Sequence, residues 1–400
     1  MSCRECQVLS RRQFLSRSGQ VLGGLALAEP LLNVVARTYA QSAGGTGNIL
    51  VLCQLNGGFD ALSFLAPFKN AAYKSRRPQL ALPESQVSVL PDHSDLGINK
   101  QFQFFHDLYV QDELAVVQQV AYPDSNGSHF ESQEIYEFGV RNLANSAATG
   151  ATWYERLRRT YFDLPYGVLD TRVIGDPTRY GYPDDTYRQA AQEAFGRLAG
   201  LKTNRSAAQQ ALLDTYKKID VNGAEIREKT AAFSSSGDAR GEFFRAAQLA
   251  SARLGTQIFR VEYGGFDTHG SQIDANADLF PRLNSEFQQF VDDMKALGLW
   301  ERTCVLFYTE FGRRNEENGS PGTDHGHGGH MILAGPRVNA GLHGQKVSTS
   351  DINQENLPYY VDFRAVFSAA IRDWLGFDPH PIFQIEGETY DENVGSALFS

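Results

Sequence analysis

Four short apolar-rich runs, each followed by polar or glycine-containing segments, constrain the fold of this chain more than any other feature. The first run covers residues 49–55 and ends abruptly at a pair of glycines. Continuous runs of this length are typical of strands buried on both faces of a parallel sheet. The same pattern recurs at residues 114–117, 256–261 and 304–308.

Helical patterns separate these runs. Between residues 280 and 297, for example, large apolar side chains recur at helical spacing. Alternation of strands and helices predicts an α/β fold with a largely parallel sheet. Residues 155–250 are more polar and rich in helical patterns, so we expect a helical insertion or cap over the core there. Ordinary crossover helices are an open alternative.

The N-terminal residues have the pattern of an export signal. The motif Ser10-Arg11-Arg12-Gln13-Phe14-Leu15 precedes a weakly apolar stretch at residues 21–32 and small residues near 38–40. This order is typical of a twin-arginine signal peptide. We expect the twin-arginine translocase to deliver a mature domain of residues 41–400 to the periplasm or the medium. The stretch is shorter than the roughly 20 residues of a membrane span, so we expect no stable membrane anchor.

Charge and cysteine content narrow the possible partners. The formal net charge of the whole chain is −10, and the expected leader carries more basic than acidic residues. An acidic surface repels nucleic acid phosphates and anionic lipid headgroups, so neither is an expected partner. Outside the leader, Cys53 and Cys304 each lie in an apolar run. Two core thiols are the preferred interpretation, with a disulfide as the alternative.

A glycine-rich loop carries a dense group of potential metal ligands. Three of the nine histidines fall in the segment Asp324-His325-Gly326-His327-Gly328-Gly329-His330. Glycine lets the backbone turn tightly enough for neighbouring side chains to converge on one ion. Imidazole and carboxylate groups are suitable ligands for divalent metals, so the loop predicts a metal site.

Other candidate ligands stand just after the predicted strands, where functional residues of open α/β sheets collect. Asp60 follows the first run, although an aspartate at this position can also be a turn or helix-capping residue. Asp267 and His269 would point to the same side of an extended backbone. The expected metal ligands are Asp60, Asp267, His269, Glu310, Asp324, His325 and His327. Zinc is the favoured ion, with manganese, magnesium or calcium as alternatives.

The candidate catalytic residues are Ser128, His129 and Arg313. Ser128 precedes a predicted helix, where its hydroxyl could act as a nucleophile at the helix N-terminus, or serve only as an N-cap. Arg313 could neutralise charge on a transferred group, or belong to a surface pair with Arg314. The chain has no Gly-x-Ser-x-Gly, phosphate-loop, dinucleotide or His-Glu-x-x-His motif. This disfavours serine hydrolases, nucleotide-triphosphate enzymes and zincin proteases.

These motifs together resemble the exported DUF1501 family, and the resemblance covers essentially the whole mature chain. The segments that carry it are the arginine pair, Leu55-Asn56-Gly57-Gly58-Phe59-Asp60, Ser128-His129-Phe130, Gly264-Gly265-Phe266-Asp267-Thr268-His269, Thr309-Glu310-Phe311-Gly312-Arg313 and Gly322-Thr323-Asp324-His325-Gly326. The resemblance implies an alkaline-phosphatase-like, three-layer α/β/α sandwich of the alkaline phosphatase and sulfatase superfamily. It also implies one or two divalent cations at the carboxyl ends of the strands.

Residue by residue, Asp60 matches the first-strand metal aspartate of that superfamily, Ser128 the nucleophile position, and Asp267 with His269 the Asp/His ligand pair. The chain departs from the pattern in its shorter Asp-x-His spacing and in Phe311, which stands where a histidine is expected. Asp324 and His325 then supply the missing ligands, or the second metal site is absent.

The resemblance implies a metal-dependent hydrolase of phosphate or sulfate esters, acting on a small-molecule or polymer-borne substrate. The alternative is a non-catalytic exported scaffold or binding protein that keeps the superfamily fold, which Phe311 favours. The sequence gives no indication of the oligomeric state.

Overall fold

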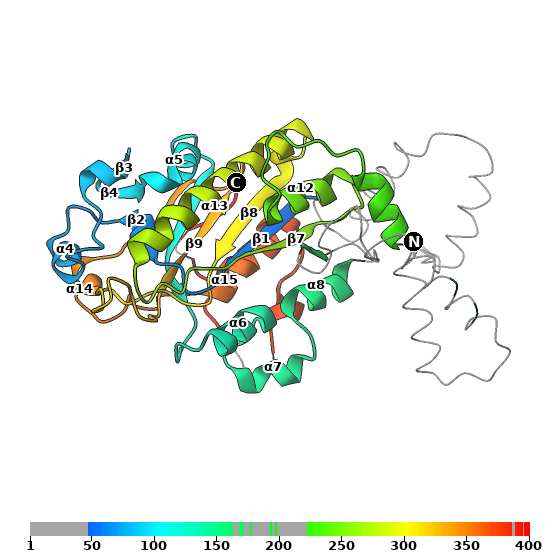
Figure 1. The fold of residues 1–400 in the computed structure, drawn as a ribbon. Coiled ribbons are helices and arrows are strands. Elements are labelled where there is room, and N and C mark those ends of the chain that lie inside the picture. The colour runs from blue at the N-terminus through cyan, green and yellow to red at the C-terminus, as the bar shows by residue number, and fades with distance from the viewer. Residues whose placement is uncertain are drawn as a thin grey trace, which may run out of the picture.

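A computed structural model describes residues 47–162, 168–171, 177, 193, 197, 222–385, 389–394 and 396–400. The expected signal peptide and much of the helix-rich segment lie outside these residues. The main sheet has the strand order β10-β5-β9-β8-β1-β7-β6, with β11 also paired to β5 (Figure 1). Its strands are mostly parallel, which confirms the predicted α/β fold.

The four strands predicted from sequence lie at the centre of this sheet. They are β1 (Ile49–Leu55), β5 (Leu114–Ala121), β7 (Ile258–Tyr263) and β8 (Thr303–Tyr308). Strand β1 runs parallel to both β7 and β8, and all seven of its residues are buried. Burial on both faces explains why these segments are continuously apolar.

The remaining strands extend the sheet on both sides. Strand β6 (Val168–Asp170) is parallel to β7, and both β10 (Gly341–Gly344) and β11 (Val361–Asp362) are parallel to β5. Strand β9 (Gly329–Ala334) is antiparallel to its neighbours β5 and β8. The amino end of β9 therefore lies at the same edge of the sheet as the carboxyl ends of the other strands.

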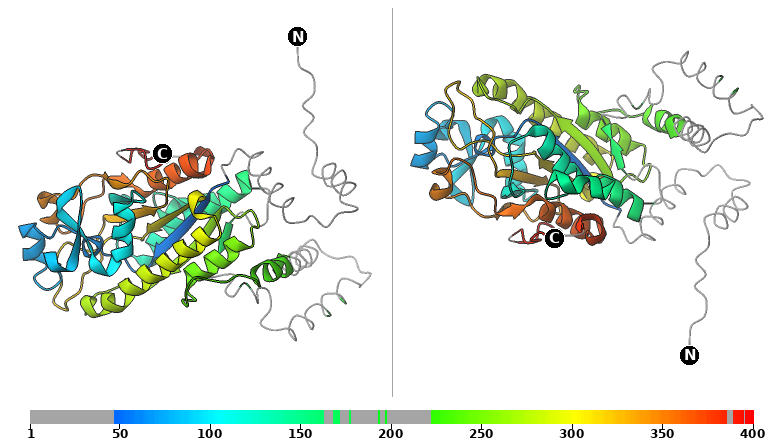
Figure 2. Two further views of the ribbon diagram at one scale, coloured as in Figure 1. Left: turned by 90° about the horizontal axis from the view of Figure 1, so that it is seen from above. Right: turned by 90° about the horizontal axis from the view of Figure 1, so that it is seen from below.

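Helices cover both faces of the sheet, which confirms the three-layer arrangement (Figure 2). One layer includes α5 (Gln103–Val110), α12 (Glu242–Ser251) and α13 (Gln272–Ala296). The other includes α6 (His129–Phe138), α7 (Leu143–Thr149), α8 (Trp153–Tyr161), α16 (His380–Phe383) and α15 (Phe363–Ala369), which continues as the π-helical turn η5 (Ala370–Leu375).

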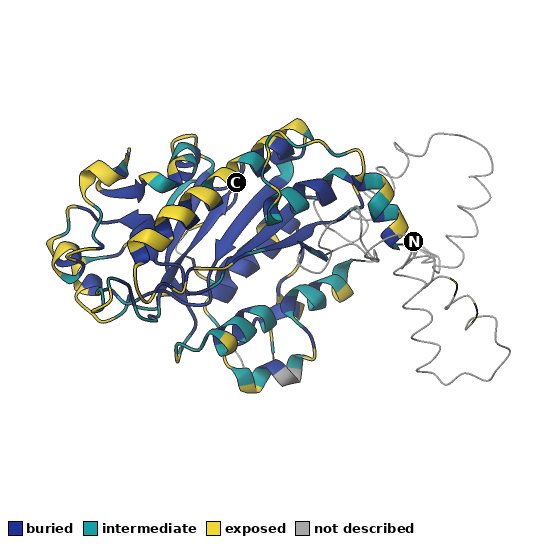
Figure 3. Cartoon of the chain, viewed as in Figure 1, coloured by how far each residue is buried: buried dark blue, intermediate teal, exposed yellow. Residues whose placement is uncertain are grey.

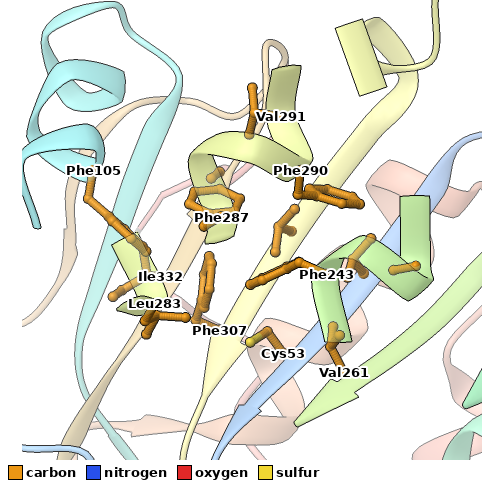
Figure 4. Close-up of a cluster of buried hydrophobic side chains, with 14 of the residues drawn as sticks. Cys53, Phe105, Phe243, Val261, Leu283, Phe287, Phe290, Val291, Phe307 and Ile332 are labelled. Carbon is orange, nitrogen blue, oxygen red and sulfur yellow. The ribbon is translucent and has the colours of Figure 1, made fainter. Parts of the chain in front are cut away.

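The side chains of β1 alternate between two hydrophobic clusters, as the pleat of a strand requires. Val51 and Cys53 pack with Phe287 and Phe307 on the α13 side, where Figure 4 shows the interior. Leu50 and Leu52 belong to the cluster on the opposite face. The strands are buried while the outer helix surfaces are exposed (Figure 3). Cys53 and Cys304 are both buried free thiols, in agreement with the core-thiol interpretation.

A smaller antiparallel sheet lies beyond the end of β1 and has the order β2-β4-β3. Its strands are β2 (Leu65–Ala66), β3 (Val87–Leu90) and β4 (His93–Asn99), and the short helices and turns around them are α3 (Ala61–Phe64), α4 (Ala71–Arg76), η1 (Glu84–Gln86), η2 (Lys100–Phe102) and α14 (Thr349–Ile352). A further 3-10 turn, η4 (Trp300–Arg302), leads into β8.

The region expected to form a helical insertion is described only in part. Its strand β6 pairs with β7, and α12 packs against the sheet, so these two elements belong to the sandwich. Much of the helical pattern within residues 155–250, including residues 185–201 and 207–219, falls almost entirely outside the described residues. No helix in the described ranges combines the length and hydropathy needed to cross a membrane.

Candidate functional site

Three imidazoles and one carboxylate converge at the carboxyl edge of the sheet. His129 lies in the first turn of α6, Asp267 and His269 in the loop after β7, and His325 in the segment before β9. The Oδ1 atom of Asp267 lies 3.4 Å from His129 Nε2, 3.0 Å from His269 Nε2 and 3.1 Å from His325 Nε2. Sequence positions far apart in the chain thus supply four ligand-type atoms to one point.

Three of these residues satisfy a geometric requirement for a metal site. Ligand atoms of His129, Asp267 and His325 all lie within 4.8 Å of one another. His129 Nε2 is buried and has no hydrogen-bond partner of acceptable geometry among the described residues. A buried polar atom without a partner is costly, and a bound cation would satisfy it. The residues present therefore fit the divalent metal that the sequence predicts.

The opposite nitrogen of each imidazole faces a hydrogen-bond acceptor. The three Nδ1 contacts are His129 with Glu310 Oε1 at 2.8 Å, His269 with Asp324 Oδ1 at 3.2 Å, and His325 with the Gly127 carbonyl oxygen at 2.7 Å. These contacts orient the rings. Glu310 and Asp324, which were expected as ligands, therefore lie behind the imidazoles.

Glu310 is completely buried at the end of β8. Its carboxylate accepts hydrogen bonds from the Gly57 amide at 2.8 Å, the Thr309 hydroxyl at 2.9 Å and Gln133 Nε2 at 3.3 Å. Burial raises the pKa of Glu310, but these hydrogen bonds and His129 outweigh it, so the pKa is lowered. The same contact with Glu310 raises the pKa of His129. Glu310 is thus held as an anion.

Gly57 permits the close approach of two site loops. Its φ of +116° lies in the region that favours glycine, and a Cβ at this position would collide with the backbone of Phe266 and Asp267. The Phe266 amide also donates to the Asn56 carbonyl at 3.2 Å. The glycine pair after β1 therefore brings the loop that carries Asp267 against the end of that strand.

Arg313 joins the site loops from the buried side. Its guanidinium donates to Asp267 Oδ1 at 2.7 Å, and it is completely enclosed. It also donates to the carbonyls of Gly57, Gly58, Phe266 and Thr323. Burial raises the pKa of Asp267, but the hydrogen bonds from Arg313 and His325 outweigh it and the pKa is strongly lowered. Arg313 therefore stabilises the arrangement of the site loops. This differs from the expected catalytic role, because its side chain is not exposed to a substrate.

Asp60 lies outside the imidazole cluster and forms a buried ion pair with Arg77. The distances from Arg77 to its two carboxylate oxygens are 2.6 and 3.1 Å. Ser63 and Gln272 also donate to Asp60, and its side chain caps α3. Both oxygens are already occupied, so the structure corrects the expectation of a metal ligand in favour of the capping alternative.

Ser128 occupies the N-cap position of α6. Its hydroxyl oxygen accepts the Glu131 amide at 3.4 Å, and Asn126 accepts the Ser128 amide at 3.0 Å. The N-cap alternative is therefore the arrangement that the structure has. Ser128 nevertheless lies between Gly127 and His129, both of which contact the cluster.

His327 points away from the cluster, since its Nε2 lies 2.7 Å from the Tyr122 carbonyl oxygen. His330 is buried at the start of β9, and burial lowers its pKa to about 4. Neither shares the contacts of His325, so only part of the histidine-rich segment belongs to the cluster. His330 begins the apolar run Met331-Ile332-Leu333, which sets it apart in the sequence, but no sequence signal separates His327 from His325.

Phe311 forms an apolar wall beside two of the imidazoles. Its ring centroid lies 4.8 Å from that of His129 and 4.7 Å from that of His325. No sequence signal indicated this packing, or the roles of Arg77 and Gly127 as partners of predicted site residues. Arg77 follows a short helix without any motif, and Gly127 acts through its backbone.

The fold and the cluster define an α/β protein with a candidate metal centre at the carboxyl edge of its sheet. The family model of DUF1501, described as a protein of unknown function, matches residues 183–388, and the chain belongs to this family. No curated protein shows significant sequence similarity to the chain.

Solved structures with a related arrangement come from several bacteria. The lipoteichoic acid synthase LtaP from Listeria monocytogenes is 10% identical, with a TM-score of 0.34 over 77% of this chain and 73% of that chain. The PsFucS1 sulfatase from Pseudoalteromonas sp. is 9% identical, with a TM-score of 0.34 over 81% and 69%. The phosphonate monoester hydrolase of Agrobacterium radiobacter is 10% identical, with a TM-score of 0.32 over 85% and 78%. All three likenesses are distant.

Proposed function

We propose that the protein is an exported, metal-dependent hydrolase of phosphate or sulfate esters. The convergence of His129, Asp267 and His325 at the carboxyl edge of the sheet is the observation that most supports this proposal. The resemblance of the motifs to the alkaline phosphatase and sulfatase superfamily supplies the substrate class. The twin-arginine motif, which lies outside the described residues, supplies the expectation of export.

His129, Asp267 and His325 would hold the ion. A bound divalent ion would polarise an ester oxygen and lower the pKa of an attacking water. Glu310 keeps the His129 ring in place, and Arg313 keeps the Asp267 carboxylate in place. Because both supports are buried, the cluster is held rigidly before substrate arrives.

The exposure of the cluster indicates where a substrate would approach. The side chains of Asp267 and His269 are 49% and 46% exposed, whereas His129 and His325 are about half as exposed. The open side therefore lies at Asp267 and His269. With the Ser128 hydroxyl engaged as a helix cap, a water molecule is the favoured nucleophile.

The test combines metal analysis with a substrate screen. We expect the purified mature protein to contain metal and to hydrolyse an aryl phosphate or an aryl sulfate. His325→Ala should abolish this turnover. His380→Ala is the matched control, because His380 also contacts a carboxylate, Asp378, but lies near the C-terminus. A metal-loaded protein that hydrolyses none of these esters would contradict the proposal.

A second candidate function is a non-catalytic exported binding protein. Phe311 favours it, because an apolar ring packs against His129 and His325 at a position where the resemblance expects a ligand. The same substrate screen separates the two candidates, since a binding protein would keep the metal without turnover.

A further inference from the structure

We propose that the cluster holds a single zinc ion through four side chains, His129, Asp267, His269 and His325, with Glu310 and Asp324 acting as positioning residues behind the imidazoles. This inference rests on the proposed metal dependence and deepens it. It adds His269 as a ligand, and it moves two carboxylates out of the ligand set.

Each imidazole of the cluster has its Nδ1 atom beside an oxygen atom. The Gly127 carbonyl can only accept a hydrogen bond, so Nδ1 of His325 must carry a proton. Carboxylate oxygens of Glu310 and Asp324 lie 2.8 and 3.2 Å from Nδ1 of His129 and His269. A ring whose Nδ1 proton is held in this way presents the lone pair of Nε2 to the centre of the cluster.

The Nε2 lone pairs face one another and the Asp267 carboxylate. His269 Nε2 lies 2.8 Å from His325 Nε2, and both lie near Oδ1 of the Asp267 carboxylate. His129 Nε2 has no hydrogen-bond partner among the described residues. Four acceptor atoms at such distances repel one another unless positive charge lies between them. A cation bound by all four removes this repulsion.

The spacing and type of the ligand atoms favour zinc. Zinc bonds to imidazole nitrogen at about 2.0–2.1 Å, so the ligand atoms of a tetrahedral site lie about 3.3 Å apart. Of the six separations among Asp267 Oδ1 and the three Nε2 atoms, four are 2.8, 3.0, 3.1 and 3.4 Å. The ligand atoms of His129, Asp267 and His325 all lie within 4.8 Å of one another, and His269 joins this group through its contacts with Asp267 and His325. Three nitrogens and one oxygen favour zinc, since magnesium and calcium prefer oxygen ligands.

The hydrogen bonds of the neighbouring carboxylates limit the site to one ion. The Glu310 carboxylate already accepts from Gly57, Thr309, Gln133 and His129. The Asp60 carboxylate is paired with Arg77. Asp60 and Glu310 follow β1 and β8 and were expected as metal ligands. Within the described ranges, both carboxylates instead accept hydrogen bonds from other groups of the protein.

The experiment measures zinc binding directly, without reference to turnover. We expect the native protein to bind one zinc per chain by elemental analysis, and its cobalt-substituted form to show the intense visible absorption of a tetrahedral site. His129→Ala and His269→Ala should each lower zinc affinity at least about 100-fold. Glu310→Gln and Asp324→Asn should lower it by about 10- to 100-fold with the stoichiometry unchanged.

His327→Ala is the matched control. His327 belongs to the same glycine-rich segment, but its imidazole contacts the Tyr122 carbonyl, so its loss should leave zinc affinity unchanged. Thermal unfolding of each metal-free variant checks that it is folded. If the buried Glu310→Gln variant does not fold, Asp324→Asn carries the same test, because the Asp324 side chain is 45% exposed.

Three results would overturn the inference. They are two zinc ions per chain, native affinity in His269→Ala, and no zinc binding by the folded native protein, which would mean that protons supply the positive charge. Zinc binding as expected without ester turnover would leave the ligand assignment intact and would contradict only the proposed hydrolase function.

Discussion

Arg77 and Asp60 form a buried ion pair just beyond the end of β1, with Nη1 and Oδ2 2.6 Å apart and side chains 0% and 5% exposed. Arg77 thus contacts the Asp60 carboxylate, which the family resemblance assigns as a metal ligand. Arg77 Nε also donates to the Asn315 carbonyl at 2.9 Å. The arginine thus links the turn after β1 to the segment that follows Arg313.

Replacing Arg77 with methionine should destabilise the protein by about 3–5 kcal/mol, because it leaves the Asp60 carboxylate buried without a partner. Chemical denaturation of the purified variant measures this cost. The matched control is Arg76→Met. Arg76 pairs with the exposed Glu316 at 3.0 Å, and such a pair contributes at most about 1 kcal/mol. Equal costs for the two variants would contradict the structural role of Arg77.

The same pair predicts a dependence of stability on pH. Burial raises the pKa of Asp60, but Arg77 and the hydrogen bonds from Ser63 and Gln272 outweigh it and lower the pKa in the folded state. The stabilisation is therefore fully present above the unfolded pKa of about 3.9, and is lost as the pH falls through the folded value. Denaturation between neutral and acid pH should show this loss. In Arg77→Met this pH-dependent contribution should become smaller, because the pairing with Arg77 is lost while the hydrogen bonds from Ser63 and Gln272 remain.

Ser128→Ala tests whether the hydroxyl is a cap or a nucleophile. Since its oxygen accepts the Glu131 amide, we expect the variant to lose about 1 kcal/mol of stability and to keep its metal. If the native protein hydrolyses an aryl ester, the variant should retain most of that turnover. Complete loss of turnover in a folded, metal-loaded variant would restore the serine mechanism.

Arg313→Lys should destabilise the protein by about 3–5 kcal/mol, because an ammonium cannot reach the several carbonyls and the Asp267 carboxylate that the guanidinium joins. Thermal and denaturant unfolding measure the loss. Arg314→Lys serves as the control, since Arg314 is 38% exposed and pairs with the exposed Glu355. A fully stable Arg313→Lys variant with altered turnover alone would indicate a catalytic role.

Replacing Arg11 and Arg12 with lysine should leave the precursor inside the cell, given the motif that surrounds them. Fractionation of cells that express the native and double-variant chains, followed by N-terminal sequencing, measures export and the cleavage point near residue 41. Normal export of the variant would remove the twin-arginine assignment.

The central strands could be predicted from sequence because a strand that is buried on both faces is a continuous run of apolar residues. The runs at residues 49–55 and 304–308 match β1 and β8 within one residue. The antiparallel direction of β9 could not be predicted, because the hydrophobicity of a strand carries no sign of its direction. The apolar residues that follow His330 have a pattern that fits a parallel and an antiparallel strand equally well.

The site was predictable where residue type and strand ends coincide, as for Asp267 and His269, which the structure places beside His325. The roles of the carboxylates that do not face the centre of the cluster could not be predicted. Glu310 and Asp60 both follow a strand, yet Glu310 orients an imidazole and Asp60 pairs with Arg77 outside the cluster. The difference depends on which donors lie nearby, and two of those donors, Arg77 and Gln133, come from segments that carry no motif.

The reversed direction of β9 has a consequence for how this protein can diverge. Because β8 leaves the sheet and β9 enters it at one edge, the connection that contains His325 never crosses to the far side of the molecule. Its two ends are fixed by strand pairing, and its outer part around Gly319 and Ser320 is exposed. Insertions and deletions at that outer part would therefore change the surface beside the His269 loop, to which Ser320 is hydrogen-bonded through Ser271, without shifting the register of the sheet. The sheet and the imidazole cluster would stay the same in related chains that differ in the length of this connection.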